Sequence, residues 1–332
     1  DQVLEIFGIT PDDDLELMAP NQDLASLTAG VLAGTTRVMR DYVPDLVVVQ
    51  GDTTSTFASA LAAYYLKIPV AHLEAGLRTR RKYSPFPEEL NRQMTSCLTD
   101  WHFAPTPRAR QTLLDEGHPA ERVFMVGNTV VDALLSVIDR ARAGGLPSQP
   151  ALQHKLAGRR FVLVTGHRRE NFGAGFRAIC SALRRLAEDQ PAVEFVYPVH
   201  LNPNVQQPVN AVLGGLANVH LVPPLGYLEF VWLMSACTLV LTDSGGVQEE
   251  APTFGKPVLV MRDSTERPEA VEAGVARLVA TDEEAIFRET KLLLENTEAY
   301  RTMSRAQNPY GDGQAARRIT AILAGDADAL QP

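Results

Sequence analysis

Acidic side chains directly follow two apolar runs of this chain, at the place where parallel sheets hold their ligands. Gly51 and Asp52 come after LVVVQ, and Glu74 comes after IPVAHL. A carboxylate at the end of a buried strand costs free energy unless it is paired, so Glu74 is a candidate functional group. Glu88 lies in SPFPEELNR, where two prolines lead into the first turn of a predicted helix and the helix dipole favours an anion. Together Asp52, Glu74 and Glu88 would supply three acids to one edge of a first domain, a set suited to proton transfer.

Each of these acids also has a purely structural interpretation. An aspartate after a strand is often a turn former, and Thr53 or Thr54 could cap the helix that follows. Glu88 and Arg92 stand four residues apart on one helix face, a spacing equally typical of an ordinary surface ion pair.

The second half of the chain offers cations after its strands. VLVTGHRREN places His167 and Arg168 after an apolar run, where they could bind an anion or form a solvated basic turn, and we favour the anion. His200 follows VYPV, although a lone histidine there is commonly structural.

The stretch LVLTDSGGVQEEAP carries the clearest signal. Ser244, Gly245 and Gly246 lie between a predicted buried strand and a helix, so their backbone N–H groups can point at phosphate oxygens. Glu249 or Glu250 could accept hydrogen bonds from ribose hydroxyls within the next two turns. Further on, VLVMRDSTERPE adds two arginines for a diphosphate, Arg262 and Arg267.

Other nucleotide and hydrolase motifs are missing from the sequence. It contains neither G-x-G-x-x-G nor G-x-x-x-x-G-K-[ST], which disfavours a dinucleotide cofactor and P-loop phosphoryl transfer. H-E-x-x-H and G-x-S-x-G are also absent. The residues alone therefore predict a nucleotide-diphosphate pocket on one domain and a set of carboxylates on another.

Seven short apolar runs alternate with longer helical segments, and the runs are continuous rather than alternating in hydrophobicity. This pattern predicts parallel strands covered on both faces, hence a doubly wound α/β fold. The predicted strands span 46–50, 68–73, 161–165, 193–199, 238–242, 257–261 and 275–280. A length of 332 residues favours two domains with a cleft between them, and the turn-prone stretch 140–160 is a candidate boundary.

Composition limits the partners and the compartment. The formal net charge of −9 disfavours nucleic acid, and no apolar run is long enough to cross a membrane. Cys97, Cys180 and Cys237 lie far apart without C-x-x-C pairs, so we expect neither a metal site nor a disulfide framework, which suits a cytoplasmic protein. The first residues, DQVLEIFGIT, lack the pattern of a signal peptide and predict the end of an amphipathic helix stopped at Gly8.

In sequence order, a series of strings resembles the non-hydrolysing UDP-N-acetylglucosamine 2-epimerases of bacteria from near residue 1 to about residue 320. The strings are GDTTSTF, HLEAGLRT, SPFPEELNR, VTGHRREN, YPVHLNPNV, LTDSGGVQEEAP, GKPVLVMRDSTERPE and NPYGDG. The resemblance implies the glycosyltransferase-B architecture, two Rossmann-like domains facing a cleft, and usually a homodimer. On that basis we expect an N-terminal domain over 1–127, a UDP-binding domain over 128–313, and a C-terminal helix at about 314–332 packing back on the first domain.

The resemblance also implies a reaction: anti elimination of UDP, a 2-acetamidoglucal intermediate, and return of UDP with the proton delivered to the other face of C2. The product would be UDP-N-acetylmannosamine for surface polysaccharides, and no metal or other cofactor is needed. Carried over to this sequence, the catalytic residues are Asp52, Glu74, Glu88 and His167. The substrate and UDP contacts are Arg92, Arg168, Phe230, Ser244, Gly245, Gly246, Glu250 and Arg267. Arg168 and His200 match positions that bind a second, activating UDP-N-acetylglucosamine in some members.

One departure from the family stands out. Members begin with a strand and a G-T-R-P-E loop, and this sequence starts after them, so the family's first βα unit is expected to be missing from it. Three other functions remain open. A hydrolysing epimerase or a transferase of the same fold would share the UDP pocket, but a transferase has little reason to keep the three acids together. A catalytically silent sugar-nucleotide sensor would bind the ligand without turnover.

Overall fold

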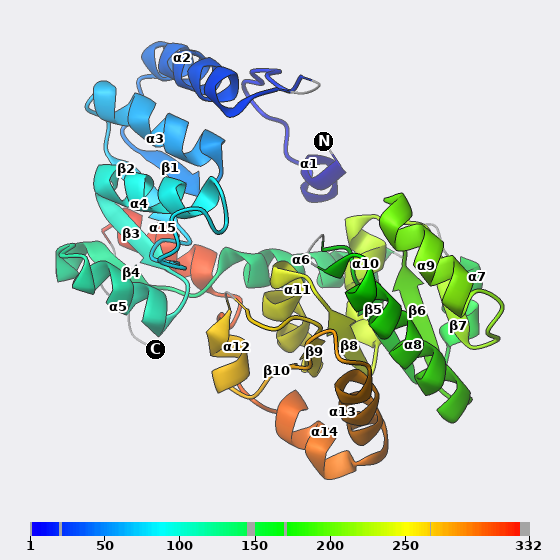
Figure 1. Cartoon of the computed structure of the whole chain (residues 1–332). Helices are drawn as coiled ribbons and strands as arrows, with labels where there is room; N and C mark the ends of the chain where they lie inside the picture. Colours follow the sequence, from blue (N-terminus) through cyan, green and yellow to red (C-terminus); the bar gives the residue numbers. More distant parts are fainter. Residues whose placement is uncertain (1, 20–21, 145–149, 169–170, 266, 326–332) are drawn as a thin grey trace. The chain divides into compact units, whose positions relative to one another are not determined.

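The computed structural model describes the chain except for residues 1, 20–21, 145–149, 169–170, 266 and 326–332 (Figure 1). The chain divides into two compact units, one of Val3–Asp132 with Tyr310–Pro332 and the other of Ala133–Pro309. Each unit holds a parallel sheet with helices around it, so the predicted α/β class is confirmed. No helix among the described residues is both long and apolar enough to cross a membrane.

The first unit is built from short parallel strands and the helices that connect them. Its elements are α1 (Gln2–Phe7), α2 (Leu24–Tyr42), β1 (Val47–Gln50), α3 (Thr54–Tyr65), β2 (Val70–Leu73), α4 (Glu88–Leu98), β3 (Trp101–Ala104), α5 (Pro107–Asp115), η1 (Ala120–Arg122), β4 (Val123–Met125) and, after the chain returns, α15 (Ala315–Leu323). Helix α1 ends as predicted, because Gly8 takes a positive φ of 64°.

The four strands of this unit pair in the order β1-β2-β3-β4, all parallel. Successive side chains of a strand point to opposite faces. Val70 packs in one cluster with alanines of α3, whereas Ala71 packs with Phe103 and with Ile319 of α15. Helices α3 and α15 therefore cover opposite faces of the sheet, and the carboxyl ends of β1 and β2 lie next to each other at one edge.

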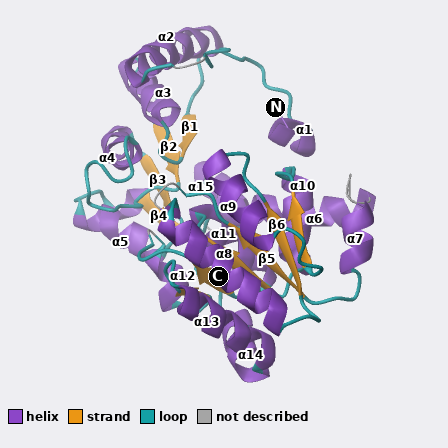
Figure 2. Ribbon diagram, turned by 45° about the vertical axis from the view of Figure 1, so that its right-hand side comes forward, coloured by secondary structure: helices purple, strands orange, loops and turns teal. Residues whose placement is uncertain are grey.

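The second unit contains the larger sheet. Its elements are the continuation of α6 (Thr129–Gly144), then α7 (Pro150–Leu156), β5 (Phe161–Thr165), α8 (Ala174–Asp189), β6 (Glu194–Pro198), α9 (Pro203–Leu213), β7 (Val219–Val222), α10 (Tyr227–Ala236), β8 (Leu239–Thr242), α11 (Gly245–Glu250), η3 (Ala251–Phe254), β9 (Val258–Val260), α12 (Pro268–Glu272), β10 (Ala276–Leu278), α13 (Glu283–Glu295) and α14 (Thr297–Ser304). Figure 2 shows its strands lying among helices.

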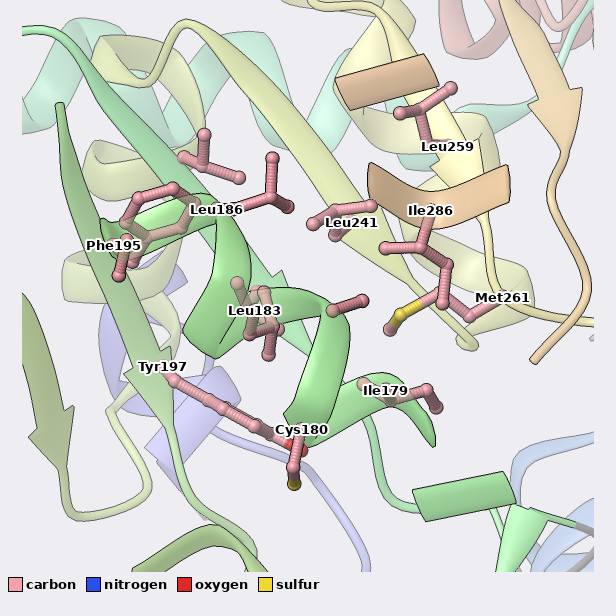
Figure 3. Packing of buried hydrophobic residues seen from close by; sticks show 14 of the residues in the cluster. Ile179, Cys180, Leu183, Leu186, Phe195, Tyr197, Leu241, Leu259, Met261 and Ile286 are labelled. Atoms are coloured by element: carbon pink, nitrogen blue, oxygen red, sulfur yellow. The ribbon is translucent and has the colours of Figure 1, made fainter. Parts of the chain in front are cut away.

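The strand order of this sheet, β10-β9-β8-β5-β6-β7, reverses between β5 and β8. The chain adds β6 and β7 on one side of β5, then crosses back and adds β8, β9 and β10 on the other. In open parallel sheets such a switch point opens a crevice at the carboxyl ends of the two central strands. Apolar side chains from β5, β6, β8, α8 and α13 fill one face of the sheet, including Leu183, Leu241 and Ile286 (Figure 3).

Every apolar run predicted to be a strand contains one. Strands β3, β4 and β7 were not predicted. Strands β3 and β7 carry a histidine at their second position, which breaks the continuous apolar pattern, and the apolar run that contains β4 spans only 123–126.

Candidate active site

Asp52 stands at the carboxyl end of β1 and is tied to helix α4. Gly51 supplies the turn with φ 74°, and Thr53, one of the two predicted candidates, is the N-cap of α3. The Oδ2 atom of Asp52 accepts two hydrogen bonds from Arg92, from Nε at 3.0 Å and from Nη2 at 2.8 Å. Asn91 donates to the backbone carbonyl of Asp52 at 3.0 Å. This aspartate is therefore held by α4 rather than left as a free turn residue.

Arg92 is not part of a surface ion pair with Glu88. It is buried, and besides Asp52 it pairs with Glu89, three residues earlier, through Nη1 at 2.8 Å. Glu89 is fully buried and also accepts the backbone N–H groups of Thr79 and Arg80, each at 2.9 Å. It thus joins the loop before α4 to Arg92, a role that sequence reasoning missed because Glu88 and Glu89 are adjacent glutamates in one helical turn.

Glu88 lies in the first turn of α4, as predicted. Its Oε2 atom is buried and receives no hydrogen bond from the described residues. A buried carboxylate oxygen without a donor is costly in a resting protein, and such groups are frequent at functional sites.

Glu74 follows β2 in a strained backbone conformation, with φ 61°. Its Oε1 accepts a hydrogen bond from Gln50 at 3.0 Å, so the glutamate stays beside the neighbouring strand end. The buried His72 contacts the carbonyl oxygen of Gly51 through Nε2 at 2.7 Å. Burial lowers the pKa of His72 to about 4, so the ring is neutral and donates this bond, which links the turns that carry Asp52 and Glu74.

In the second unit, the loops after β5 and β8 flank the switch point of the sheet. The hydroxyls of Thr165 and Thr242, the last residues of these strands, are 2.6 Å apart. Ser244 donates its backbone N–H to Thr242 Oγ1 at 2.9 Å and is the N-cap of α11, so the predicted strand–turn–helix arrangement of residues 244–246 is confirmed.

Asp243 joins the two loops and was not singled out from the sequence. It is fully buried, and its Oδ2 accepts the backbone N–H groups of His167 and Arg168, each at 2.9 Å, and the side-chain amide of Asn171 at 3.1 Å. Tyr197 donates to the carbonyl of Gly166 at 3.0 Å on the same loop. The signal for Asp243 was its place after an apolar run, the same place that drew attention to Asp52.

These loops line a pocket of about 340 Å³. Its walls are Thr165, Gly166, His167, Pro198, His200, Pro224, Leu225, Tyr227, Phe230, Ser244, Gly246, Val247 and Glu250. Of the predicted UDP contacts, Phe230, Ser244, Gly246 and Glu250 line it, together with His167. Gly245 is buried in α11, and Arg168 and Arg267 are not among the wall residues.

The pocket wall has an apolar part and a part formed by two histidine rings. Pro224, Leu225 and Phe230 form an apolar stretch of wall, whereas the rings of His167 and His200 lie nearly parallel, with centroids 5.7 Å apart and an interplanar angle of 17°. Such a wall can accept a flat base at one place and an anionic group at another.

Glu250 is the acidic side chain that lines the pocket. Burial, followed by the charge of Glu249, raises the pKa of Glu250 to about 7. Glu249 itself forms an ion pair with Arg267, with Nε and Oε1 2.6 Å apart. Arg267 is thereby positioned after β9 by a buried carboxylate, and Glu250 remains the acid that faces the pocket.

Two α/β units with parallel sheets, one with a nucleotide-type pocket at its switch point and one with acids at adjacent strand ends, define an enzyme of the glycosyltransferase-B structural class. A family model described as UDP-N-acetylglucosamine 2-epimerase matches residues 1–324. The chain belongs to this family, whose members are isomerases.

Individual relatives agree. The UDP-N-acetylglucosamine 2-epimerase of Salmonella typhimurium is 54% identical over 326 residues, covering 97% of this chain and 87% of the relative. A crystal structure from Listeria monocytogenes has a TM-score of 0.92 at 46% identity, covering 98% of this chain and 86% of the other. The enzyme of Neisseria meningitidis, solved bound to UDP-GlcNAc, has a TM-score of 0.86 at 45% identity, covering 98% and 88%.

Proposed function

We propose that this protein interconverts UDP-N-acetylglucosamine and UDP-N-acetylmannosamine by inverting C2 of the sugar. The observation that carries the proposal is the pocket at the β5–β8 switch point, which combines an apolar wall, a helix start and the acid Glu250. A family relative has been solved with UDP-GlcNAc bound, which supports the same ligand here.

The C2 proton is not next to a carbonyl carbon, so its removal must be coupled to departure of UDP. In the proposed anti elimination, a carboxylate takes the C2 proton while the C–H electron pair becomes the C1–C2 double bond. The C1–O bond breaks on the opposite face, and its electrons leave with UDP. The diphosphate oxygen of UDP then returns to C1 as a proton is delivered to the other face of C2, which gives the epimer without a metal or nicotinamide.

The second unit would bind UDP and stabilise it as the leaving group. Ser244, Gly245 and Gly246 would offer N–H groups to the diphosphate, with Arg267 as a cation nearby. Glu250 would accept hydrogen bonds from ribose hydroxyls, and Phe230 would pack on the uracil. His167, half exposed at the pocket wall, would contact the diphosphate and stabilise the charge that develops on it.

The first unit would supply the acids for proton transfer. Asp52, Glu74 and Glu88 are the proposed catalytic carboxylates, and the buried Oε2 of Glu88 without a donor fits an acid whose partner arrives with the substrate. Arg92 was predicted as a substrate contact. Its two hydrogen bonds to Asp52 support a further role, in which Arg92 holds the Asp52 carboxylate in place.

Several finer features belong to the same proposal. Arg168 and His200 would touch a second, activating UDP-N-acetylglucosamine, and the enzyme would act as a homodimer in the cytoplasm, where it would supply N-acetylmannosamine units for surface polysaccharides. The expected domain limits of 1–127 and 128–313, with the C-terminal helix returning to the first domain, are retained as part of this proposal.

The experiment that tests the proposal is product analysis by ³¹P and ¹H NMR with UDP-N-acetylglucosamine as the substrate. UDP-N-acetylmannosamine with its diphosphate ester intact supports epimerisation. Free UDP with free sugar would instead establish the hydrolysing rival, and transfer of the sugar to an added acceptor would establish a transferase. Saturable binding with unchanged substrate would establish a sensor.

The Glu74→Gln variant tests the role of the first unit. It removes a proton acceptor and leaves the pocket of the second unit intact, so we expect epimerisation to fall at least ~100-fold while the Kd for UDP changes less than ~3-fold. The exposed Glu121→Gln, in the same unit, is the matched control and should turn over normally. Near-normal turnover of Glu74→Gln would contradict the assigned role.

A further inference from the structure

The carboxylate of Asp243 is satisfied on one oxygen and unsatisfied on the other. Its Oδ2 accepts three hydrogen bonds, from two backbone N–H groups and from Asn171, which fixes the orientation of the whole carboxylate. Its Oδ1 is buried and receives no hydrogen bond from the described residues. A buried carboxylate oxygen left without a donor costs about 1–3 kcal/mol, so we expect a hydrogen-bond donor for Oδ1 near by.

That partner is the ring of His167. The Nδ1 atom of His167 lies 3.6 Å from Asp243 Oδ1, within ion-pair range but too long for a hydrogen bond. The ring is half exposed, and a hydrogen bond would require the two atoms to lie about 2.8 Å apart. Because Asp243 is anchored to the backbone of His167 itself, the carboxylate and the ring move with the same loop.

Among the residues that the structure describes, two further groups near the ring have hydrogen-bond partners of their own. His200 stacks on His167, and its own Nδ1 accepts the backbone N–H of Asn202 at 3.1 Å. The hydroxyl of Tyr197 is already donated to the carbonyl of Gly166. The stacked His200 ring also limits how far the His167 ring can swing.

We propose that Asp243 is a positioning residue for His167: its Oδ1 accepts a hydrogen bond from Nδ1–H and thereby leaves Nε2 to face the ligand in the pocket. In a neutral histidine, the hydrogen bond of one ring nitrogen decides the tautomer and so the chemistry of the other. With Nδ1–H donated to Asp243, Nε2 is the ring nitrogen through which His167 exchanges a proton with an oxygen of the ligand.

This inference rests on the proposed function for the identity of the ligand, but its test does not depend on turnover. Long-range ¹H–¹⁵N NMR spectra of the free protein report which ring nitrogen of His167 carries the proton. We expect the Nδ1–H tautomer for the neutral ring in the parent protein. An Nε2–H tautomer in the parent would overturn the proposal without any variant, whether or not the protein is an epimerase.

The Asp243→Asn variant sharpens the test. Its amide keeps an oxygen for the backbone N–H groups and turns an N–H₂ toward His167, so the ring should switch to the Nε2–H tautomer. We expect kcat to fall about 100-fold with a Kd for UDP within ~3-fold.

The control is Asn171→Ala, which removes a hydrogen bond from the satisfied Oδ2 and leaves Oδ1 untouched. It should keep the Nδ1–H tautomer and lose less than ~10-fold in kcat. Equal loss of activity in both variants with no change of tautomer in Asp243→Asn would show that Asp243 only holds the loop together, which contradicts the proposal.

Discussion

Replacement of Glu250 by glutamine should change the stability of the protein in a way that depends strongly on pH. In the free protein, burial and then the neighbouring Glu249 raise the pKa of this carboxyl from 4.5 to about 7. The unfolded chain releases the proton near pH 4.5, whereas the folded chain keeps it until near pH 7. Stability therefore falls as the pH rises through this range, and the loss is complete above pH 7.

The magnitude follows from the difference between the two pKa values. One pKa unit corresponds to about 1.4 kcal/mol, so the ionised carboxylate destabilises the folded protein by about 3 kcal/mol at pH 8 but by less than about 1 kcal/mol at pH 5. Glu250→Gln removes this titration. For a unit of this size, the difference in Tm between the variant and the parent should be about 5–10 °C larger at pH 8 than at pH 5.

The assay is scanning calorimetry of parent and variant at pH 5 and pH 8, with the exposed Glu298→Gln as the control. A second measurement is the Kd for UDP as a function of pH. In the proposed site the ribose hydroxyls donate hydrogen bonds to the ionised Glu250 carboxylate, so the Kd of the parent should rise as the pH falls below 7, approaching tenfold per pH unit. The variant should bind more weakly and without this dependence. An equal Tm change at both pH values, or a parent Kd that is flat from pH 6 to 8, would refute the reasoning.

Three further changes test the first unit. Arg92→Gln removes the ion pairs to Asp52 and Glu89 and leaves the buried Glu89 carboxylate uncompensated, so the free energy of unfolding should fall by about 3 kcal/mol. Turnover should fall at least ~10-fold, and unchanged turnover would exclude the positioning role. Burial, followed by the charge of His118, lowers the pKa of His102 to about 3. The unfolded chain therefore binds a proton below pH 6.5 that the folded chain does not, and the parent loses about 2 kcal/mol of unfolding free energy between pH 7 and pH 5. His102→Gln should remove this loss, as measured by urea unfolding at the two pH values. Gly76 has φ 91°, and a Cβ there would overlap the carbonyl of Ala109, so Gly76→Ala should cost about 3 kcal/mol or more, and a melting curve like the parent's would contradict this.

Much of the fold follows from pattern alone. Buried parallel strands have continuous apolar sequences, and all seven predicted runs contain a strand. Positions after those runs identified Asp52, Glu74 and the turn at Ser244, because parallel strands bring their carboxyl ends to one edge. Two of the three strands that were missed, β3 and β7, are interrupted by a histidine, and pairing with neighbours in the sheet decides the conformation of all three more than their own residues do.

The partners of the site residues were harder to predict. Helical spacing suggested Glu88 for Arg92, but the side chain turns inward to Glu89 and to Asp52, forty residues earlier in the chain. Asp243 acquires its importance from donors 72 to 76 residues away, which only the adjacency of β5 and β8 brings together. Contacts of this range depend on topology, and spacing within a single element does not encode them.

Loss and return of the C2 proton while UDP stays within the enzyme is the key step of the proposed reaction. It is tested most directly by incubating the protein with UDP-N-acetylglucosamine in deuterated water and following the C2 position by ¹H NMR. We predict UDP-N-acetylmannosamine that carries deuterium at C2, with deuterium entering the remaining substrate as the reaction reverses. An epimer that keeps its original hydrogen at C2 would contradict the account.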